Sequence, residues 1–267
     1  MQRIDSPQNA RIKRWKRLMQ ETRFQKKEGA ALLEGAHLAE SYFATHRKVS
    51  AVLFARNANA EARYWVEKYA RRNVPLFEIS RSLWRDLAPV ENGIGLMVEI
   101  PTRRENVDKV LEQASRSDVL YLDGVQDAGN VGTMIRTAVA AGVRFIVTSP
   151  KTAGIYTPKV LRAGMGAHFG ATCIENVTMA DFARVYQGRI VAADARGGKD
   201  LFAERDTYAQ GPLCWIMGAE GPGVSEEALS YTHQRYYIPI DRHCRSLNVG
   251  AAAAICLFDM RRRRRGV

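Results

Sequence analysis

The stretch LDGVQDAGNVGTMIRTAVAAGV, Leu122–Val143, predicts a strand, a glycine-rich turn and a helix in succession. The apolar run from Val119 to Val125 indicates a buried strand that leads into the turn. The turn is not the G-x-G-x-x-G of a dinucleotide-binding fold, and no lysine follows it as in a phosphate-binding P-loop. It carries Asn130 instead, with Arg136 six residues later, and these two side chains are the first candidates for chemistry.

The same alternation of strand and helix continues around this stretch, from Asp118 to the C-terminus. Strands rich in valine, isoleucine and leucine, separated by helices, predict an α/β fold with a mostly parallel sheet covered on both faces. Ligands in such sheets bind at the carboxyl ends of the strands. Three strand ends are rich in glycine and polar residues, and they are GNVGTMIR, IMGAEGPGVS and IPIDRHCRSLNVG.

The first hundred residues also alternate between strand and helix patterns, which predicts a small layered α/β domain. PTRREN, which starts at Pro101, then interrupts the pattern with proline and charge. We therefore expect a domain over residues 1–100, a linker over 101–117 with a helix at VDKVLEQAS, and a second domain over 118–267.

The chain is strongly basic, with a net charge of +12 and an isoelectric point of about 9.8. This charge favours nucleic acid as a partner. SPQNARIKRWKRLMQ predicts a helix that Ser6 caps and in which Pro7 occupies the first turn. Its apolar face is formed by Ile12, Trp15, Leu18 and Met19, and its other face is a basic stripe of Lys13, Arg14, Lys16 and Arg17. The stripe is expected to contact RNA; the alternative is a solvated helix face.

Several classes of protein are excluded by composition. The four cysteines are scattered without a C-x-x-C, which indicates reduced thiols of a cytoplasmic protein. The five histidines form no cluster with cysteine, so we expect no metal site. No apolar run approaches the ~20 residues of a membrane span, and no signal sequence is expected at the N-terminus. The run Arg261–Arg265 is interpreted either as an RNA contact or as a disordered end.

The second and third strand ends each have a physical interpretation. In MGAEGPG, three glycines allow the backbone to approach a ligand closely, and Glu220 supplies one carboxylate. In IPIDRHCRSLNVG, Ser246 or Asn248 is expected to cap the last helix. Taken singly, each motif is explained as well by an ordinary turn or helix cap.

Together, and in this order, the three motifs resemble the SpoU (TrmH-like) branch of the SPOUT RNA methyltransferases. The resemblance covers about Val119 to Arg264. The N-terminal half, above all RFQKKEGAALLEGAHLAES, more loosely resembles the ribosomal-protein-like substrate-binding domain of family members that act on large-subunit rRNA. The chain departs from the family in two places that bear on nucleotide specificity. Gly250 stands where a serine is common, and the loop DRHCR is more charged than usual.

The resemblance implies a fold that composition does not reveal, a deep trefoil knot at the carboxyl end of the sheet. It also implies a homodimer with the active site near the subunit boundary. The cofactor implied is S-adenosylmethionine, held in the knot loops. The implied cofactor-binding residues are Met217, Gly218, Ile238, Ile240 and Leu247.

The reaction implied is transfer of the sulfonium methyl group to a ribose 2′-OH of RNA. Large-subunit rRNA is the expected substrate, with tRNA as the alternative. The implied catalytic residues are Asn130, Arg136, Glu220, Ser246 and Asn248. Because a guanidinium stays protonated in proteins, we favour Arg136 as an electrostatic stabiliser of the developing alkoxide over a general base. Glu220 is expected to fix the arginine by an ion pair.

Two other classes of protein remain as alternatives. One is an RNA-binding or ribosome-assembly protein that has lost catalysis on the same scaffold. The retained set of five polar residues argues against it, and cofactor binding would discriminate. The other is a dinucleotide-dependent oxidoreductase, which the broken glycine pattern disfavours.

Overall fold

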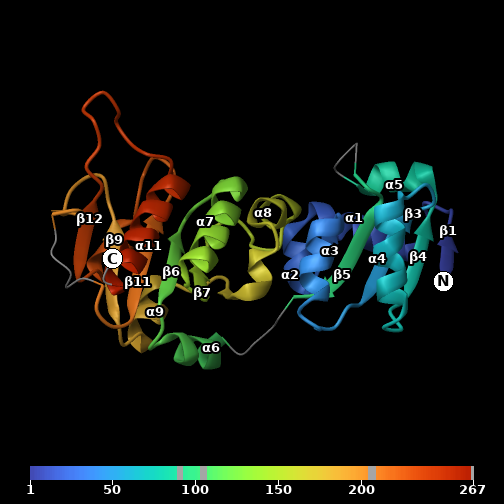
Figure 1. Ribbon diagram of the computed structural model, residues 1–267, viewed down its shortest axis with the longest axis horizontal. Coiled ribbons are helices and arrows are strands. Elements are labelled where there is room, and N and C mark those ends of the chain that lie inside the picture. The colour runs from blue at the N-terminus through green and yellow to red at the C-terminus, as the bar shows by residue number, and fades with distance from the viewer. Residues whose placement is uncertain (89–92, 103–106, 204–208, 266–267) are drawn as a thin grey trace. The chain divides into compact units, whose positions relative to one another are not determined.

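The computed structural model describes residues 1–88, 93–102, 107–203 and 209–265. The chain divides into two compact units. Unit 1 comprises Met1–Arg104 with Tyr156–Phe169, and unit 2 comprises Glu105–Ile155 with Gly170–Val267. Figure 1 shows that each unit contains a sheet with helices packed against it. Residues 103–106 of the expected linker lie outside the described residues, and the helix expected next to them is α6 (Val107–Ala114).

Unit 1 is built on a five-stranded mixed sheet in the order β1-β4-β3-β5-β2. The first three strands in this order are parallel, and β5 pairs antiparallel with both of its neighbours. The strands are β1 (Gln2–Ile4), β2 (Ala30–Glu34), β3 (Ala51–Ala55), β4 (Leu76–Ile79) and β5 (Leu96–Pro101). The helices are α1 (Ala10–Gln20), α2 (Thr22–Glu28), α3 (Ala36–Phe43), α4 (Ala60–Ala70), α5 (Arg81–Leu87) and α8 (Pro158–Gly164). The layered α/β domain predicted for this half is confirmed.

Helix α1 begins later than the sequence predicts. Asn9, not Ser6, is its N-cap, and the Asn9 side chain accepts a hydrogen bond from the Arg11 amide. The Ser6 hydroxyl instead accepts from the Gln8 amide in the turn before the helix, so the expectation that Ser6 caps α1 was wrong. The predicted apolar face is confirmed, since Trp15 is fully buried and its Nε1 donates to a carboxylate oxygen of the buried Glu99 at 2.7 Å.

Unit 2 is built on a seven-stranded sheet in the order β10-β12-β9-β11-β6-β7-β8, and every strand pair in it is parallel. The strands are β6 (Val119–Asp123), β7 (Phe145–Thr148), β8 (Thr172–Ile174), β9 (Arg189–Ala193), β10 (Lys199–Asp200), β11 (Leu213–Gly218) and β12 (Gln234–Tyr237). Its other helices are α7 (Ala128–Ala141), α9 (Met179–Val185), α10 (Glu226–Ser230) and α11 (Val249–Arg265). The predicted parallel sheet is confirmed; the two-residue strand β10 was not foreseen.

The strand order of unit 2 reverses beside β6. From β6 the chain adds β7 and β8 on one side, and then crosses over to place β9 and β11 on the other. The carboxyl ends of β6 and β11 therefore flank a topological switch point, where open parallel sheets bind their ligands. The first strand-end motif follows β6 and the second follows β11. The third leaves β12, and its helix α11 packs against α7 and β11 (Figure 1).

Four of the five arginines at the end of α11, Arg261–Arg264, make hydrogen bonds or ion pairs within the chain. Arg261 donates to the carbonyl oxygen of Ala140 at 2.8 Å, and the side chain of Arg263 is 4% exposed and pairs with Asp259 at 2.7 Å. Arg264 forms an ion pair with Asp118 and donates to the carbonyl oxygens of Ala209 and Gly211. The contacts of Arg261 and Arg264 fasten the end of α11 to the end of α7 and to the segments that precede β6 and β11.

Arg264→Ala should lower the free energy of unfolding by about 2 kcal/mol, because it leaves a carboxylate and two carbonyl oxygens without their charged donor. Urea denaturation measures this change. Arg265→Ala is the matched control, since Arg265 is exposed and makes no hydrogen bond or ion pair with any described residue. It should change stability by less than about 0.5 kcal/mol. Equal effects of the two substitutions would contradict the structural role of Arg264.

Candidate active site

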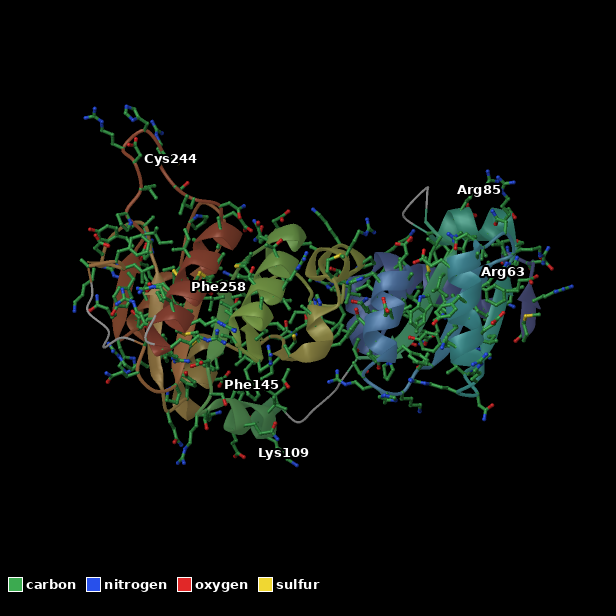
Figure 2. The ribbon with its side chains drawn as sticks, viewed as in Figure 1. Arg63, Arg85, Lys109, Phe145, Cys244 and Phe258 are labelled. Atoms are coloured by element: carbon green, nitrogen blue, oxygen red, sulfur yellow. The ribbon has the colours of Figure 1, made fainter. Side chains whose placement is uncertain are left out.

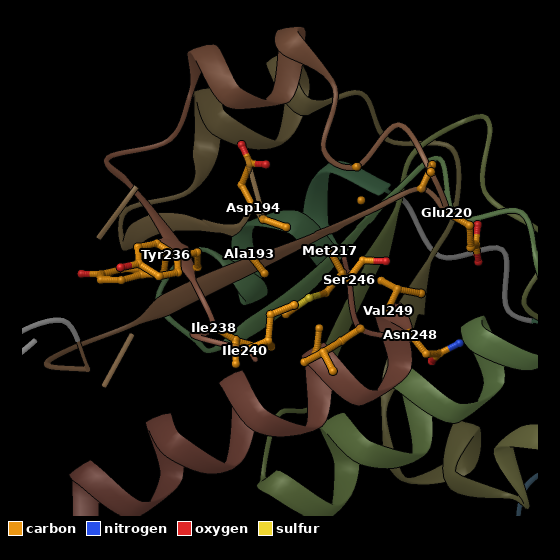
Figure 3. Close-up of a pocket in the computed structure, with 18 residues that line it drawn as sticks. Ala193, Asp194, Met217, Glu220, Tyr236, Ile238, Ile240, Ser246, Asn248 and Val249 are labelled. Atoms are coloured by element: carbon orange, nitrogen blue, oxygen red, sulfur yellow. The ribbon is translucent and has the colours of Figure 1, made fainter. Parts of the chain in front are cut away.

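A pocket of about 410 Å³ opens at the carboxyl ends of β9, β11 and β12. Figure 3 shows its lining, in which side chains from these strand ends face the segment that leads into α11. Its lining is mainly apolar and includes the polar residues Asp194, Glu220 and Ser246. The residues predicted to bind the cofactor, which are Met217, Gly218, Ile238, Ile240 and Leu247, all line this pocket. A pocket of this size and character is suited to a small-molecule ligand.

The motif after β11 forms one wall of the pocket, and within it the backbone turns back tightly on itself. Ala219 and Gly223 pair with each other by two hydrogen bonds, so the residues between them form a small hairpin. A Cβ atom added at Gly218 would lie 2.1 Å from the backbone of Gly223 and Val224. No other residue fits at position 218 without moving this hairpin. The glycine therefore serves the loop's own packing as well as the pocket.

Three of the five predicted catalytic residues are joined by hydrogen bonds at one end of the pocket. The Asn130 side-chain amide donates to Glu220 Oε1 at 2.9 Å, and its Oδ1 accepts from Asn248 Nδ2 at 3.0 Å. Asn248 also caps α11, since its Oδ1 accepts from the Gly250 amide at 2.8 Å. Because each of the three residues comes from a different strand-end motif, the network joins all three motifs at the switch point.

Glu220 is held in its ionised form. Burial raises the pKa of its carboxyl, but hydrogen bonds from the Asn130 side chain and from nearby backbone amides, including that of Gln126, outweigh this effect and leave the pKa below its usual range. The carboxylate thus acts as an acceptor that fixes the orientation of the Asn130 amide.

Arg136 lies apart from this network. It is exposed on α7, and it makes no hydrogen bond or ion pair with any residue of the described parts of the chain. The expected ion pair between Glu220 and Arg136 does not form, because the Glu220 carboxylate is taken by Asn130 and the Gln126 amide. A spacing of six residues turns Arg136 away from Asn130 around the helix.

Ser246 lines the pocket and is exposed. It does not cap α11, which leaves Asn248 as the cap of the two candidates. Gly250, where the family commonly has serine, is buried against α7, and a Cβ atom there would lie 3.4 Å from Thr133 Cγ2 and 3.1 Å from Asn248 Oδ1. Helices α11 and α7 can therefore approach each other closely at this point because residue 250 has no side chain.

Sequence reasoning missed Asp194, a carboxylate in the wall of the pocket that is only 4% exposed. Asp194 Oδ1 accepts from Arg196 Nε at 2.9 Å, and Arg196 also donates to the carbonyl oxygen of Val224 at 2.8 Å. Burial raises the pKa of Asp194, but hydrogen bonds from Arg196 and the charge of Arg235 bring it below its usual range. The sequence did contain a signal for this residue, because Asp194 directly follows the apolar strand RIVAA and so stands at a strand end.

The four residues of the predicted RNA-binding stripe on α1 differ in their surroundings. Arg14 forms ion pairs with Glu28 at 2.8 Å and Glu99 at 2.9 Å. Arg17 pairs with Glu21 and lies over the ring of Phe24, and Lys13 donates to Gln8. Lys16 is exposed and has no hydrogen-bond partner among the described residues. The positive charge of Arg14 and Arg17 is therefore largely balanced within the domain.

Among the residues that the structure describes, no three histidine, cysteine or acidic side chains are grouped so that they would hold a metal ion. No helix in the same part of the chain combines the length and apolar character needed to cross a membrane.

The fold and the pocket define an α/β enzyme that binds a small cofactor at a switch point. The chain matches the SpoU rRNA Methylase family over residues 118–258, which is more than half of its length, and the MRM3-like substrate binding domain over residues 9–97. The chain therefore belongs to the SpoU rRNA methylase family, and it is an RNA methyltransferase. The resemblance seen in the three sequence motifs is confirmed.

Curated relatives agree with this assignment. The chain is 27% identical to the 23S rRNA (guanosine(2553)-2′-O)-methyltransferase RlmP of Bacillus subtilis, over 98% of this chain and 100% of that protein. It is 30% identical to the 23S rRNA (guanosine-2′-O-)-methyltransferase RlmB of Vibrio cholerae, over 73% of this chain and 80% of that protein. The crystal structure of an rRNA methyltransferase from Sinorhizobium meliloti with AdoMet bound shares the fold, with a TM-score of 0.83 at 23% identity over 98% of this chain and 97% of that one.

Asn130→Ala removes the side-chain donor that lowers the pKa of Glu220, so this pKa should rise. A folded-state pKa below the unfolded value, about 4.3, stabilises the fold above that pH, and the contribution is lost as pH falls through the folded pKa. Unfolding measured from pH 3 to pH 7 should therefore depend less steeply on pH in the variant, which should also lose about 1 kcal/mol at pH 7. The control is Thr133→Ala, an exposed position on the same helix. An identical pH dependence in wild type and Asn130→Ala would refute the role of the network.

Proposed function

We propose that this enzyme transfers the methyl group of S-adenosylmethionine to the 2′-OH of a ribose in large-subunit rRNA. The observation that carries the proposal is the hydrogen-bonded set of Asn248, Asn130 and Glu220 at the mouth of the pocket. Such a set is expected of a site that must orient a hydroxyl next to a bound methyl donor. The 23S rRNA activity named for both curated relatives supports large-subunit rRNA over tRNA.

The residues that line the pocket fit S-adenosylmethionine. Met217, Ile238 and Leu247 supply apolar contacts for a nucleoside, and the strand-end backbone supplies hydrogen-bonding groups. Asp194 in the wall is paired with Arg196 and Arg235, so the charge of its carboxylate is balanced within the chain. The cofactor, when bound, supplies an electrophilic methyl group. The protein positions and polarises the acceptor hydroxyl, whose proton is released to water as its oxygen takes the methyl group.

In this proposal the residues have separate roles. Glu220 locks the side-chain amide of Asn130, and Asn130 with Ser246 orients the ribose. Arg136 keeps its charge at neutral pH and stabilises the developing alkoxide or an adjacent phosphate by two hydrogen bonds. Since Arg136 has no carboxylate partner among the described residues of its own chain, it is available to the RNA.

The assembly and location are part of the same proposal. We place the active site near the boundary of a homodimer with a trefoil-knotted sheet, as the family resemblance implies. The side chain of Phe258 on α11 is 46% exposed and is a candidate for the dimer interface (Figure 2). The four cysteines all lie in described parts of the chain and form no disulfide, which suits an enzyme that works in the reducing cytoplasm.

The function is tested by incubating the full chain with labelled S-adenosylmethionine, a chelator and a protein-free large-subunit rRNA transcript. Label should appear as a single 2′-O-methylated nucleotide, and calorimetry should show cofactor binding under the same conditions. A tRNA pool is the comparison substrate. Absence of cofactor binding at millimolar concentration would favour the noncatalytic RNA-binding alternative, and transfer to tRNA alone would overturn the rRNA assignment.

Arg136→Lys should reduce methyl transfer by at least about 10²-fold, or ~2.7 kcal/mol, because lysine keeps the charge but lacks the planar pair of donors. Cofactor affinity should change little. The shape of the pH–rate profile should be the same in both enzymes; a guanidine acting as base would shift it, since lysine has a reference pKa of about 10.4. Arg184→Lys, an exposed arginine on α9, is the control. Near-full activity of Arg136→Lys would exclude both roles.

The RNA-binding role of α1 is tested with Lys13→Glu/Lys16→Glu. This pair spares Arg14, whose reversal would set a third carboxylate beside Glu28 and Glu99 and damage the fold. Affinity for the rRNA transcript should fall, and the slope of log K against log[salt] should flatten by about 0.7 for each lost single-strand phosphate contact. Lys48→Glu/Arg71→Glu makes the same charge change at other exposed positions of unit 1. Equal losses in the two pairs would show that only net charge matters.

A further inference from the structure

The segment between β12 and α11 carries an exposed, charged arm, which we define as Asp241–Arg245. All five of its residues are exposed, and so are the residues on either side from Pro239 to Asn248. Figure 2 labels Cys244 on this arm, which extends away from the sheet and helices of unit 2. A segment with so little burial is not explained by packing within its own chain.

The arm has two arginines whose charge the chain does not balance. Its one carboxylate, Asp241, is occupied by His243, whose Nδ1 lies 2.7 Å from Asp241 Oδ1 and whose amide donates to the same oxygen. Arg242 and Arg245 make no hydrogen bond or ion pair with any residue that the structure describes.

Other arginines of unit 2 behave differently from these two. Arg196 and Arg235 share Asp194, Arg263 pairs with Asp259, and Arg264 pairs with Asp118. Arg242 and Arg245, like Arg136 and Arg265, keep their guanidinium donors unused within the described parts of the chain.

The arm is attached to the pocket at both ends. Ile240 precedes it, and Ser246, Leu247 and Asn248 follow it, and all four line the pocket. The Cα atom of Arg245 is one residue, about 3.8 Å, from that of Ser246. The arm therefore begins and ends at the pocket, on the segment that also supplies Asn248 to the hydrogen-bonded network.

A guanidinium binds a phosphate through two parallel hydrogen bonds. A ribose 2′-OH in RNA is always flanked by phosphates on its 3′ and 5′ sides. An RNA that places its ribose at this pocket must therefore bring phosphates next to the arm. We propose that Arg242 and Arg245 bind the phosphates that flank the target ribose and so position the target nucleotide; this inference rests on the proposed 2′-O-methyltransferase function.

The test uses full-length Arg242→Gln and Arg245→Gln with the large-subunit rRNA transcript as the probe. Each substitution should lower kcat/KM about tenfold at 150 mM salt. Each should also flatten the log–log salt dependence of transcript binding by about 0.7, the value for one single-strand phosphate contact. The dissociation constant for S-adenosylmethionine should stay within about twofold, and the mass in solution should be unchanged.

Arg184→Gln is the matched control. It removes one exposed arginine near the amino-terminal ends of the strands, whereas the arm lies at their carboxyl-terminal ends. Arg184 lies two residues before Tyr186, whose hydroxyl donates to the Ser117 carbonyl just ahead of β6. It should change kcat/KM by less than about twofold.

Three results would overturn the proposal. The first is a salt dependence and kcat/KM that match those of Arg184→Gln. The second is a large loss of cofactor affinity, which would make the arm part of the cofactor site. The third is an altered mass in solution, which would mean that a second copy of the chain covers the arm. Failure of the underlying function has a different signature, because wild type would then bind the transcript without methylating it, and the salt dependence would still test the arm.

Discussion

The proposed active site depends on the side-chain amide of one residue, Asn130. Asn130 donates to Glu220 and accepts from Asn248, so that one residue joins segments lying 90 and 118 positions away along the chain. The amide satisfies both bonds only if the loops after β6 and β11 and the start of α11 meet at the switch point. The parallel sheet brings the first two together, since β6 and β11 are neighbours. The third must return from β12, past the ends of β9 and β11, before α11 can pack on α7.

The pocket forms because the segment between β12 and α11 passes back along the ends of β9 and β11. The segment from Ile238 to Val249 passes over the ends of the strands, and its apolar residues form one wall while β11 and the hairpin at Gly218 form another. The C-terminal end of α11 must also be fixed in place, because α11 packs against α7 and β11. The arginines at its end do this by donating to a carboxylate and to carbonyl oxygens at the end of α7 and in the segment that precedes β11. The same residue type thus has a structural role at one end of α11 and a proposed binding role at the other.

Most of the fold was predictable from the sequence, because apolar periodicity and glycine-rich strand ends identify buried parallel strands. The short strands β1 and β10 were not, since three-residue and two-residue elements leave no periodic signal. Nor was the placement of Tyr156–Phe169 with unit 1, which depends on tertiary packing such as the bond from the buried Gln25 to the Tyr156 carbonyl. At the site, the three motifs predicted that Asn130, Glu220 and Asn248 belong together. They did not predict which of these residues hydrogen-bonds to which. The expected Glu220–Arg136 pair failed because helix geometry separates Arg136 from Asn130, and Asp194 was missed because no recognised motif contains it.

The central claim is that this chain methylates a ribose in large-subunit rRNA. The most direct measurement maps 2′-O-methyl groups across all cellular RNA from cells with the gene, without it, and with the Arg136→Lys protein in its place. The account predicts that one site in large-subunit rRNA disappears on deletion and returns only with the wild-type protein. An unchanged large-subunit rRNA, or a lost methyl group confined to tRNA, would contradict it.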